Sequence, residues 1–332
     1  MKRVILFVLI MITVGAAAQT GRLYTTNDKL SSSIVSQVFQ DQKGRIWIPT
    51  LNGLNVYDGY SFRTFKRSLG LANNSVNWVM QTRTGDIYIG MSNALQRYER
   101  STFVDVPMYD RTGKKVAAFV NHIIERQNGE IMVSTSGYGI YRVDPDHKAA
   151  HQLDGPYADI KYSHRLAEDK GQRIWVLTED SGVFLFKGAS RQQYMHHGEM
   201  KRQFSSICVD GSDRVFIGND HTGLYRFVPH SKEGFRQIPT TTGLHIATIT
   251  LKRDGNLFLG CDGQGVIQYD TKTGKVEPLS YTSTDIDLNK SKAVSIMEDK
   301  NGNIWIGLLQ KGVYMQSMRP NNFRYLGRKS GQ

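Results

Sequence analysis

Short stretches in which apolar and polar residues alternate recur along the chain. Residues 35–41 (VSQVFQD) alternate in this way and predict a strand with one buried face. Residues 46–50 contain little polarity, as in a strand covered on both faces, and residues 54–57 and 62–66 predict two further strands. A tight turn at 42–44 and the Asn52-Gly53 pair supply reversals between the first three strands. This stretch therefore predicts a sheet of four antiparallel strands.

The same pattern occurs seven times, at steps of 41 to 47 residues. Each copy has a large residue in its second strand and a small residue six or seven positions later. The large residues are Trp47, Tyr88, Met132, Trp175, Phe216, Phe258 and Trp305, and the small ones are Gly53, Ala94, Gly139, Gly182, Gly223, Gly265 and Gly312. Four-stranded units of this length match propeller blades, whereas solenoids of helix pairs do not fit. We predict an all-β fold, a single seven-bladed β-propeller over residues 19–320, with the large residues packed between blades.

Both ends of the chain carry signals of their own. Lys2 and Arg3, the apolar residues 4–14 and the alanines at 16–18 predict a signal peptide over residues 1–18 and hence a periplasmic location; an uncleaved anchor is the alternative. Residues 23–25 look like a fourth strand without the preceding three, so we expect an N-terminal strand to complete the last blade and close the ring. The similar residues 323–326 (FRYL) lie in a C-terminal tail, 321–332, and indicate the start of a second propeller.

Charge and cysteine content limit the classes of partner. The formal charge is +12, but the basic residues are scattered, which argues against nucleic-acid binding. The positive excess gives weak support to an acidic ligand and is better explained by a solvated surface. Cys208 and Cys261 fall in different strands of adjacent repeats, so we predict two separate thiols and no disulfide.

Two segments carry a family resemblance. IVSQVFQDQKGRIWIPTLNGLNVYD (34–58) and AVSIMEDKNGNIWIGLLQKGVY (293–314) resemble the two-component regulator propeller repeat. Two repeats depart from it, because Met132 replaces an aromatic residue and Gln172 occupies the position of the turn glycine. The resemblance implies the periplasmic sensor of a hybrid histidine kinase, in which two such rings often bind glycans.

The resemblance implies a binding role and no catalytic residues in this chain. The sequence holds one ring and no kinase or phosphorelay segment, so we expect either a fragment of a longer receptor or a stand-alone relative. The FRYL element favours the fragment. A second propeller domain or a homodimer partner is expected, and no cofactor is implied.

Departures from the repeat at the rim of the central channel provide candidate ligand-binding residues. Trp78 stands where the first copy has Gln37, and His164 where it has Ser36. Aromatic, Arg and His side chains on polar loops suit a small oligosaccharide, acidic ones included, although propeller loops are polar in any case. The candidates are Trp78, Tyr138, Tyr162, His164, Arg202, Asn219, Asp220 and His221.

Metal and catalytic motifs are incomplete. Residues 285–289 begin like a calcium loop, but Lys290 replaces the turn glycine and Ile296 the bidentate glutamate, and His196-His197 lacks a third ligand nearby, so we predict no metal site. Two alternative functions remain open. One is a lyase resembling the streptogramin lyases, whose base would be His164, His221 or His245. The other is a protein-interaction scaffold.

Overall fold

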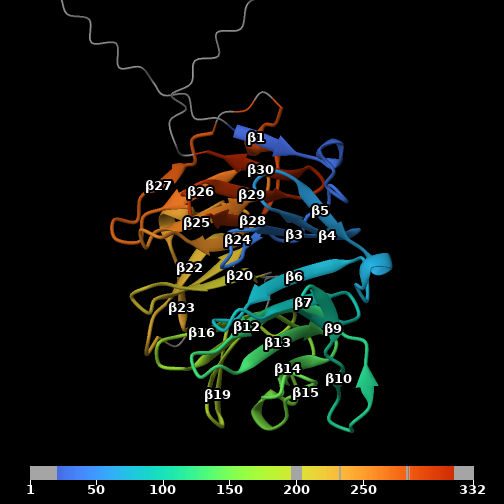
Figure 1. Cartoon of the computed structure of the whole chain (residues 1–332). Coiled ribbons are helices and arrows are strands. Elements are labelled where there is room, and N and C mark those ends of the chain that lie inside the picture. The colour runs from blue at the N-terminus through green and yellow to red at the C-terminus, as the bar shows by residue number, and fades with distance from the viewer. Residues whose placement is uncertain (1–20, 196–203, 232, 282, 284, 318–332) are drawn as a thin grey trace, which may run out of the picture.

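The computed structural model describes residues 21–195, 204–231, 233–281, 283 and 285–317, and these form seven sheets around a common axis (Figure 1). Strands within a blade are antiparallel and follow one another from the axis outward. The all-β seven-bladed prediction is confirmed. The strands of blades one to three are β2 (Phe39–Gln40), β3 (Ile46–Thr50), β4 (Gly53–Tyr57), β5 (Phe62–Phe65); β6 (Val76–Gln81), β7 (Ile87–Met91), β8 (Leu95–Glu99), β9 (Thr102–Asp105); and β12 (Phe119–Glu125), β13 (Ile131–Ser136), β14 (Gly139–Val143), β15 (Ala150–Gln152).

The remaining four blades repeat the same order. Their strands are β16 (Ser163–Glu168), β17 (Ile174–Thr178), β18 (Val183–Lys187), β19 (Ser190–Tyr194); β20 (Phe204–Val209), β21 (Val215–Asn219), β22 (Gly223–Phe227), β23 (Phe235–Gln237); β24 (Ile246–Leu251), β25 (Leu257–Cys261), β26 (Val266–Tyr269), β27 (Val276–Pro278); and β28 (Ala293–Glu298), β29 (Ile304–Leu308), β30 (Gly312–Gln316) with β1 (Gly21–Tyr24). Five short 3-10 turns lie between strands: η1 (Thr26–Asp28), η2 (Arg67–Leu69), η3 (Gly155–Tyr157), η4 (Pro239–Thr241) and η5 (Leu288–Lys290). Among the described residues, no helix is long and apolar enough to cross a membrane.

The third blade has two strands more than predicted. Its sheet contains β10 (Met108–Tyr109) and β11 (Lys115–Val116), which come from the connection between blades two and three. β10 pairs in parallel with the outer strand β15, and β11 pairs with β10. The connection therefore folds against the outer edge of blade three.

The predicted packing role of the large second-strand residues is confirmed. Seven apolar clusters occupy the seven interfaces between neighbouring blades, and each contains the large residue of one blade with strands of the next. Trp47, Tyr88 and Trp175 are fully buried, and Met132 is 3% exposed. Because one twisted sheet cannot cover both of its faces, these interfaces supply the core.

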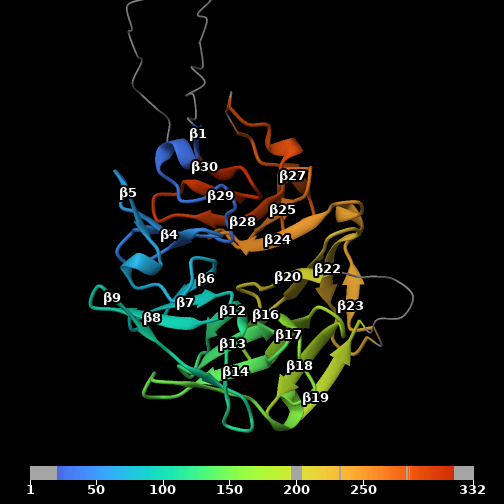
Figure 2. The same cartoon turned by 90° about the vertical axis from the view of Figure 1, so that its right-hand side faces the viewer.

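The predicted N-terminal closure is also confirmed. β1 pairs antiparallel with β30, and Gly21 lies opposite Gln316 (Figure 1). Tyr24 is buried and stacks on Trp305, with ring centroids 5.5 Å from Tyr57 and 5.7 Å from Trp305. Figure 2 shows the blue first strand beside the red last strands, so the first and last parts of the described chain meet in one blade.

The innermost strands differ from the prediction in one detail. In six blades the register shifts near the start of the first strand, as between Ser163 and Arg165, which leaves one bulged residue. In blade one, Val35 forms only an isolated bridge to Thr50, and the regular strand is Phe39–Gln40 rather than residues 35–41. A bulge turns a side chain away from the ladder, here towards the axis.

Cys208 and Cys261 are free thiols in different strands, as predicted. Burial raises the pKa of both thiols to about 12, which makes them poor nucleophiles. The predicted signal peptide and the FRYL element of the sequence lie outside the described residues.

Candidate functional site

Most of the candidate residues that depart from the repeat lie on one face of the ring of blades. It is formed by the loops between second and third strands and by the connections between blades, and we call it the connection face. Each first strand begins at this face, so the bulged residues lie at the mouth of the axial channel. The first strands of successive blades contact one another around that channel.

The bulged residues form a row of hydrogen bonds from blade to blade. Asn77 donates to the carbonyl oxygen of Val120 (3.1 Å), and Asn121 donates to that of Ser163 (2.9 Å). The row continues with His164, whose Nε2 lies 3.1 Å from the carbonyl oxygen of Ser205. The row fixes the mouth of the channel from blade two to blade five.

A pocket of about 350 Å³ opens at this mouth between blades four and five. It is lined by His164, Glu179, Phe204, Ser205 and Asp220, and we call it the channel-mouth pocket. Glu179 is held in place by a hydrogen bond from the Ser136 hydroxyl to its Oε1 (3.0 Å). The pocket thus presents two carboxylates, a hydroxyl and an imidazole beside one aromatic ring.

His164 is neutral in this setting. Burial, followed by the nearby Arg165 guanidinium, lowers the pKa of His164 to about 3. Because its Nε2 faces a carbonyl oxygen, that nitrogen carries the proton and donates. Nδ1 is then an acceptor for a ligand hydroxyl.

Asp220 and His221 form a pair on the blade-five loop. Their Oδ1 and Nδ1 atoms are 2.7 Å apart, and the His245 ring lies 5.9 Å from the His221 ring between centroids. The His221 side chain is largely exposed. The pair can orient an imidazole beside the channel-mouth pocket.

The Asn219 side chain is buried in its own loop, where it is not placed to contact a ligand. It is 1% exposed, and its Oδ1 accepts the backbone N–H groups of His221 and Thr222 (both 2.9 Å). Thr50 and Thr178 cap the equivalent loops in the same way, with the N–H of Asn52 and of Ser181. Asn219 therefore shapes the loop, and its Nδ2 is buried without a partner.

Tyr138 and Tyr162 are exposed on the connection face, at 40% and 43%, in the loop between β13 and β14 and in the connection that enters blade four. The Glu179 N–H donates to the backbone carbonyl oxygen of Tyr162, whereas the Tyr162 ring lies towards Gly137 in the loop of blade three. Of the nine exposed large apolar side chains among the described residues, six lie on the connection face. They are Leu51, Leu69, Phe119, Tyr138, Tyr162 and Leu309.

Trp78 lies inside the channel rather than on a rim loop. Its ring contacts His122 edge-on, with centroids 4.3 Å apart, and Arg165 lies over it at 4.9 Å. Trp78 also has a packing role, because it packs against the core between blades two and three. Arg202, the remaining candidate, lies outside the described residues.

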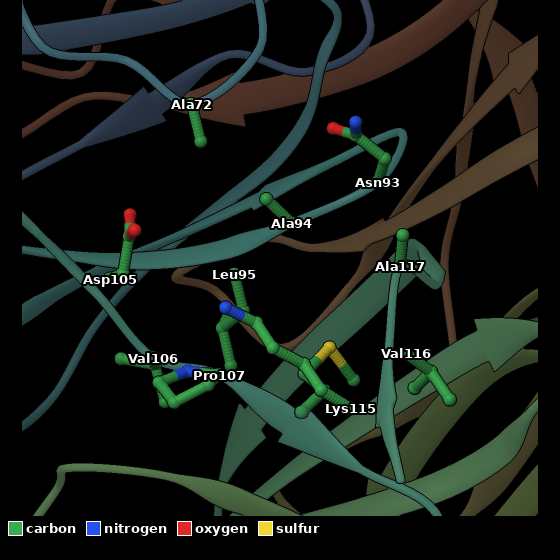
Figure 3. A pocket seen from close by; sticks show the side chains of 11 residues that line it. Ala72, Asn93, Ala94, Leu95, Asp105, Val106, Pro107, Lys115, Val116 and Ala117 are labelled. Carbon is green, nitrogen blue, oxygen red and sulfur yellow. The ribbon is translucent and has the colours of Figure 1, made fainter.

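A second pocket, of about 390 Å³, opens between blade two and the added strands of blade three. Figure 3 shows Asn93, Asp105 and Lys115 among otherwise apolar side chains. Ala94, the one small residue of the repeat that is not glycine, lines it. None of its residues was a candidate, because the sequence signal is only a connection that is slightly longer than average.

Several residues of the site were missed by the sequence reasoning. Glu179, Phe204 and Ser205 line the channel-mouth pocket, and His122 and Arg165 contact Trp78. A signal for the last two existed, because both occupy the position of Trp78 in their own repeats. Within the described ranges, no three His, Cys, Asp or Glu side chains gather where they could hold a metal ion.

Comparison with known proteins agrees with this architecture. Residues 287–309 match the family model "Two component regulator propeller", so the seventh blade carries a repeat of that family, as the resemblance implied. No curated protein matches the sequence.

Several solved structures share the fold. The extracellular domain of a putative hybrid two-component system from B. thetaiotaomicron superposes with a TM-score of 0.77 at 21% identity, over 92% of this chain and 43% of that one. A second such domain from the same organism gives 0.73 at 17%, over 90% and 42%. The chain thus spans less than half of these domains. Virginiamycin B lyase from Staphylococcus aureus gives 0.66 at 14%, over 91% of this chain and 99% of the lyase.

Proposed function

We propose that this propeller is a ligand-binding domain of an exported two-component receptor and that it binds a saccharide at the channel mouth. The observation that carries the proposal is the channel-mouth pocket, where Glu179, Asp220 and Ser205 meet the neutral imidazole of His164. Carboxylate oxygens and an unprotonated ring nitrogen accept hydrogen bonds, and sugar hydroxyls donate them. A concave site with a few convergent polar groups is typical of small-ligand binding.

The exposed tyrosines provide the second part of a saccharide site. The apolar face of a sugar ring packs on an aromatic ring, and Tyr138 and Tyr162 are exposed on the connection face, to which the pocket also opens. Because both residues belong to loops on a rigid ring, binding needs little ordering of the protein. The similarity to extracellular domains of two-component systems supports the receptor role.

Calorimetric titration with a panel of neutral and acidic oligosaccharides tests the proposal. We expect one class to bind without turnover, and Tyr162→Ala or Glu179→Gln to weaken binding about tenfold or more, the loss typical of a central contact. Tyr60→Ala is the matched control, since Tyr60 is 95% exposed in the turn between β4 and β5 on the opposite face. Absence of binding across the panel, or equal affinities for Tyr162→Ala and the unmodified protein, would contradict it.

A lyase is the second candidate, favoured by the Asp220–His221 pair. A carboxylate bound to Nδ1 orients an imidazole for proton abstraction, and the fold matches a lyase over nearly its whole length. Incubation with a streptogramin B compound, with products separated by chromatography, distinguishes the two functions. Conversion that disappears in His221→Ala would favour the lyase, whereas an unchanged compound favours the receptor.

A further inference from the structure

Arg165 carries a positive charge into the axial channel, and no carboxylate among the described residues pairs with it. Its Nη1 donates to the carbonyl oxygens of Asn121 (3.1 Å) and His164 (3.3 Å). Both hydrogen bonds leave from Nη1, so Nε and Nη2 have no acceptor among the described residues. These two nitrogens form one of the edges with which a guanidinium binds a carboxylate or sulfate in a bidentate manner.

The position of Arg165 in the channel follows from the blades that it joins. Its strand, β16, is the innermost strand of blade four, and Trp78 is in β6 of blade two. Blade three lies between them, so their contact at 4.9 Å runs along the channel side of β12. His122 of β12 completes this group against the Trp78 ring.

The groups around Arg165 do not compensate its charge. Burial, then Arg165 itself, lowers the pKa of His122 well below its ordinary value, and His164 is neutral for the same two reasons. Burial alone lowers the pKa of Arg165 to about 10, with no acidic group acting on it, so it stays protonated at neutral pH. Charged groups in a protein interior normally have a partner of opposite charge, because an unpaired charge loses its hydration and gains no ion pair in exchange.

The equivalent positions in the blades opposite carry no further charge. The residues equivalent to Arg165 in blades five, six and seven are Ser206, Thr248 and Ser295, all much smaller. Arg165 itself is partly exposed, so solutes in the channel can reach it.

We propose that Arg165 is an anion-binding residue, and that the saccharide bound at the channel mouth carries a carboxylate or sulfate group that pairs with it. The proposal rests on the proposed function and specifies the class of its ligand. Glu179 and Asp220 line the channel-mouth pocket between blades four and five. As carboxylates they would accept hydrogen bonds from the hydroxyls of the saccharide, and Arg165 would bind its acidic group.

Tryptophan fluorescence gives a direct test. Trp47, Trp175 and Trp305 are buried, with each indole N–H bonded to an aspartate, so Trp78 is the accessible fluorophore of the four. A positive channel concentrates anions, and we expect iodide to quench Trp78 about threefold more strongly than caesium at equal ionic strength. Arg165→Met should abolish this preference, and Trp78→Phe should remove the quenchable component. Equal quenching by both ions, or a preference that survives in Arg165→Met, would overturn the proposal.

Protection against iodide identifies the source of the anion. Glucuronate should protect Trp78 at concentrations at which glucose and sulfate do not. Protection by sulfate alone would keep the anion site and reject the saccharide as its source, so failure of the proposed function and failure of the anion site are distinguishable. Arg165→Met should melt no lower than the unmodified protein, because it removes an unpaired charge; a clear loss of stability together with loss of protection would show a structural role instead and reject the proposal.

Discussion

A buried aspartate fixes the turn between the first two strands of four blades, and in three of them it also accepts an indole N–H. Asp41 accepts the Arg45 backbone N–H (2.9 Å), the Arg45 Nε (2.7 Å) and the Trp47 indole N–H (2.9 Å). Burial acts to raise the pKa of Asp41, but the hydrogen bonds from Trp47 and Arg45 outweigh it and hold the pKa below its ordinary value. A buried indole N–H needs a hydrogen-bond acceptor. The aspartate six residues earlier supplies that acceptor, so a tryptophan can be buried at this position.

This spacing was readable in the sequence, since each tryptophan at the blade interface has an aspartate six residues before it. Asp169 bonds Trp175, and Asp299 bonds Trp305, at 2.9 Å each. The side chains at the channel mouth were harder to predict, because the bulge that turns His164 towards the axis leaves no mark in the alternation of residues.

Gln172 provides a prediction about a single backbone position. It adopts φ 58° in the turn where five other blades have a glycine, such as Gly44 at 85°, and where blade five has Asp213 at 63°. A residue with a Cβ is strained in the left-handed region, whereas glycine is not. Glycine also gains conformational freedom on unfolding, which offsets part of the stability that relief of the strain provides. We expect Gln172→Gly to raise the free energy of unfolding by up to about 1 kcal/mol, measured by denaturant titration. Gln172→Ala should leave it nearly unchanged, and a destabilised Gln172→Gly would contradict the assignment of strain.

At the scale of elements, glycine at the start of the third strand lets two backbone segments meet. A Cβ on Gly223 would lie 2.2 Å from the carbonyl oxygen of Thr241, and one on Gly139 would lie 2.3 Å from that of Ile160. Both glycines also have positive φ. The small residue of each repeat is thus needed for the contact between a blade and the connection that leaves it.

Gly223→Ala should therefore destabilise the protein by about 2–4 kcal/mol, through the clash and the strained φ together. Ala94→Gly is the matched control, because Ala94 occupies the same repeat position with ordinary φ beside the second pocket. Thermal unfolding of the two variants compares them directly. Similar melting temperatures for both would show that the close approach is not what selects glycine.

The sequence predicts second, third and fourth strands well and the added strands poorly. The expected strands at 46–50 and 54–57 correspond to β3 and β4 within one residue, because hairpin turns and apolar runs mark their limits. β10 and β11 contain two residues each and depend on the edge of β15 for their pairing. A strand that forms only because a partner strand is available has no pattern of apolar and polar residues by which the sequence could reveal it.

At the scale of the whole molecule, the ring closes through contacts between residues far apart in sequence. The Val38 N–H donates to the Ser295 hydroxyl (2.9 Å), and the Lys300 N–H donates to Gln40 Oε1 (2.7 Å). These bonds and the β1–β30 pairing together join blade seven to blade one. The channel-mouth pocket depends on the same long-range order, which single-repeat patterns do not encode.

Deletion of residues 19–25 should open this closure. We expect a lower melting temperature and concentration-dependent association, because the edge of β30 and the Trp305 ring would be uncovered. A peptide with the sequence of residues 19–26 should restore the melting temperature by adding a strand, whereas the same peptide with Tyr24→Ser should not. Light scattering and thermal unfolding measure both effects; an unaffected deletion variant would refute the role of β1 as the closing strand.

The pairing of Gly21 with Gln316 also has a mechanical consequence. Tension applied between these two residues loads a single strand pair at one end, and the ladder separates one residue pair at a time instead of shearing as a block. The pairings within the other six blades bear none of this load, because β1 and β30 belong to the same sheet. Whatever the ring is tethered to, a pull through both tethers would peel β1 away from β30 before any other blade is disturbed.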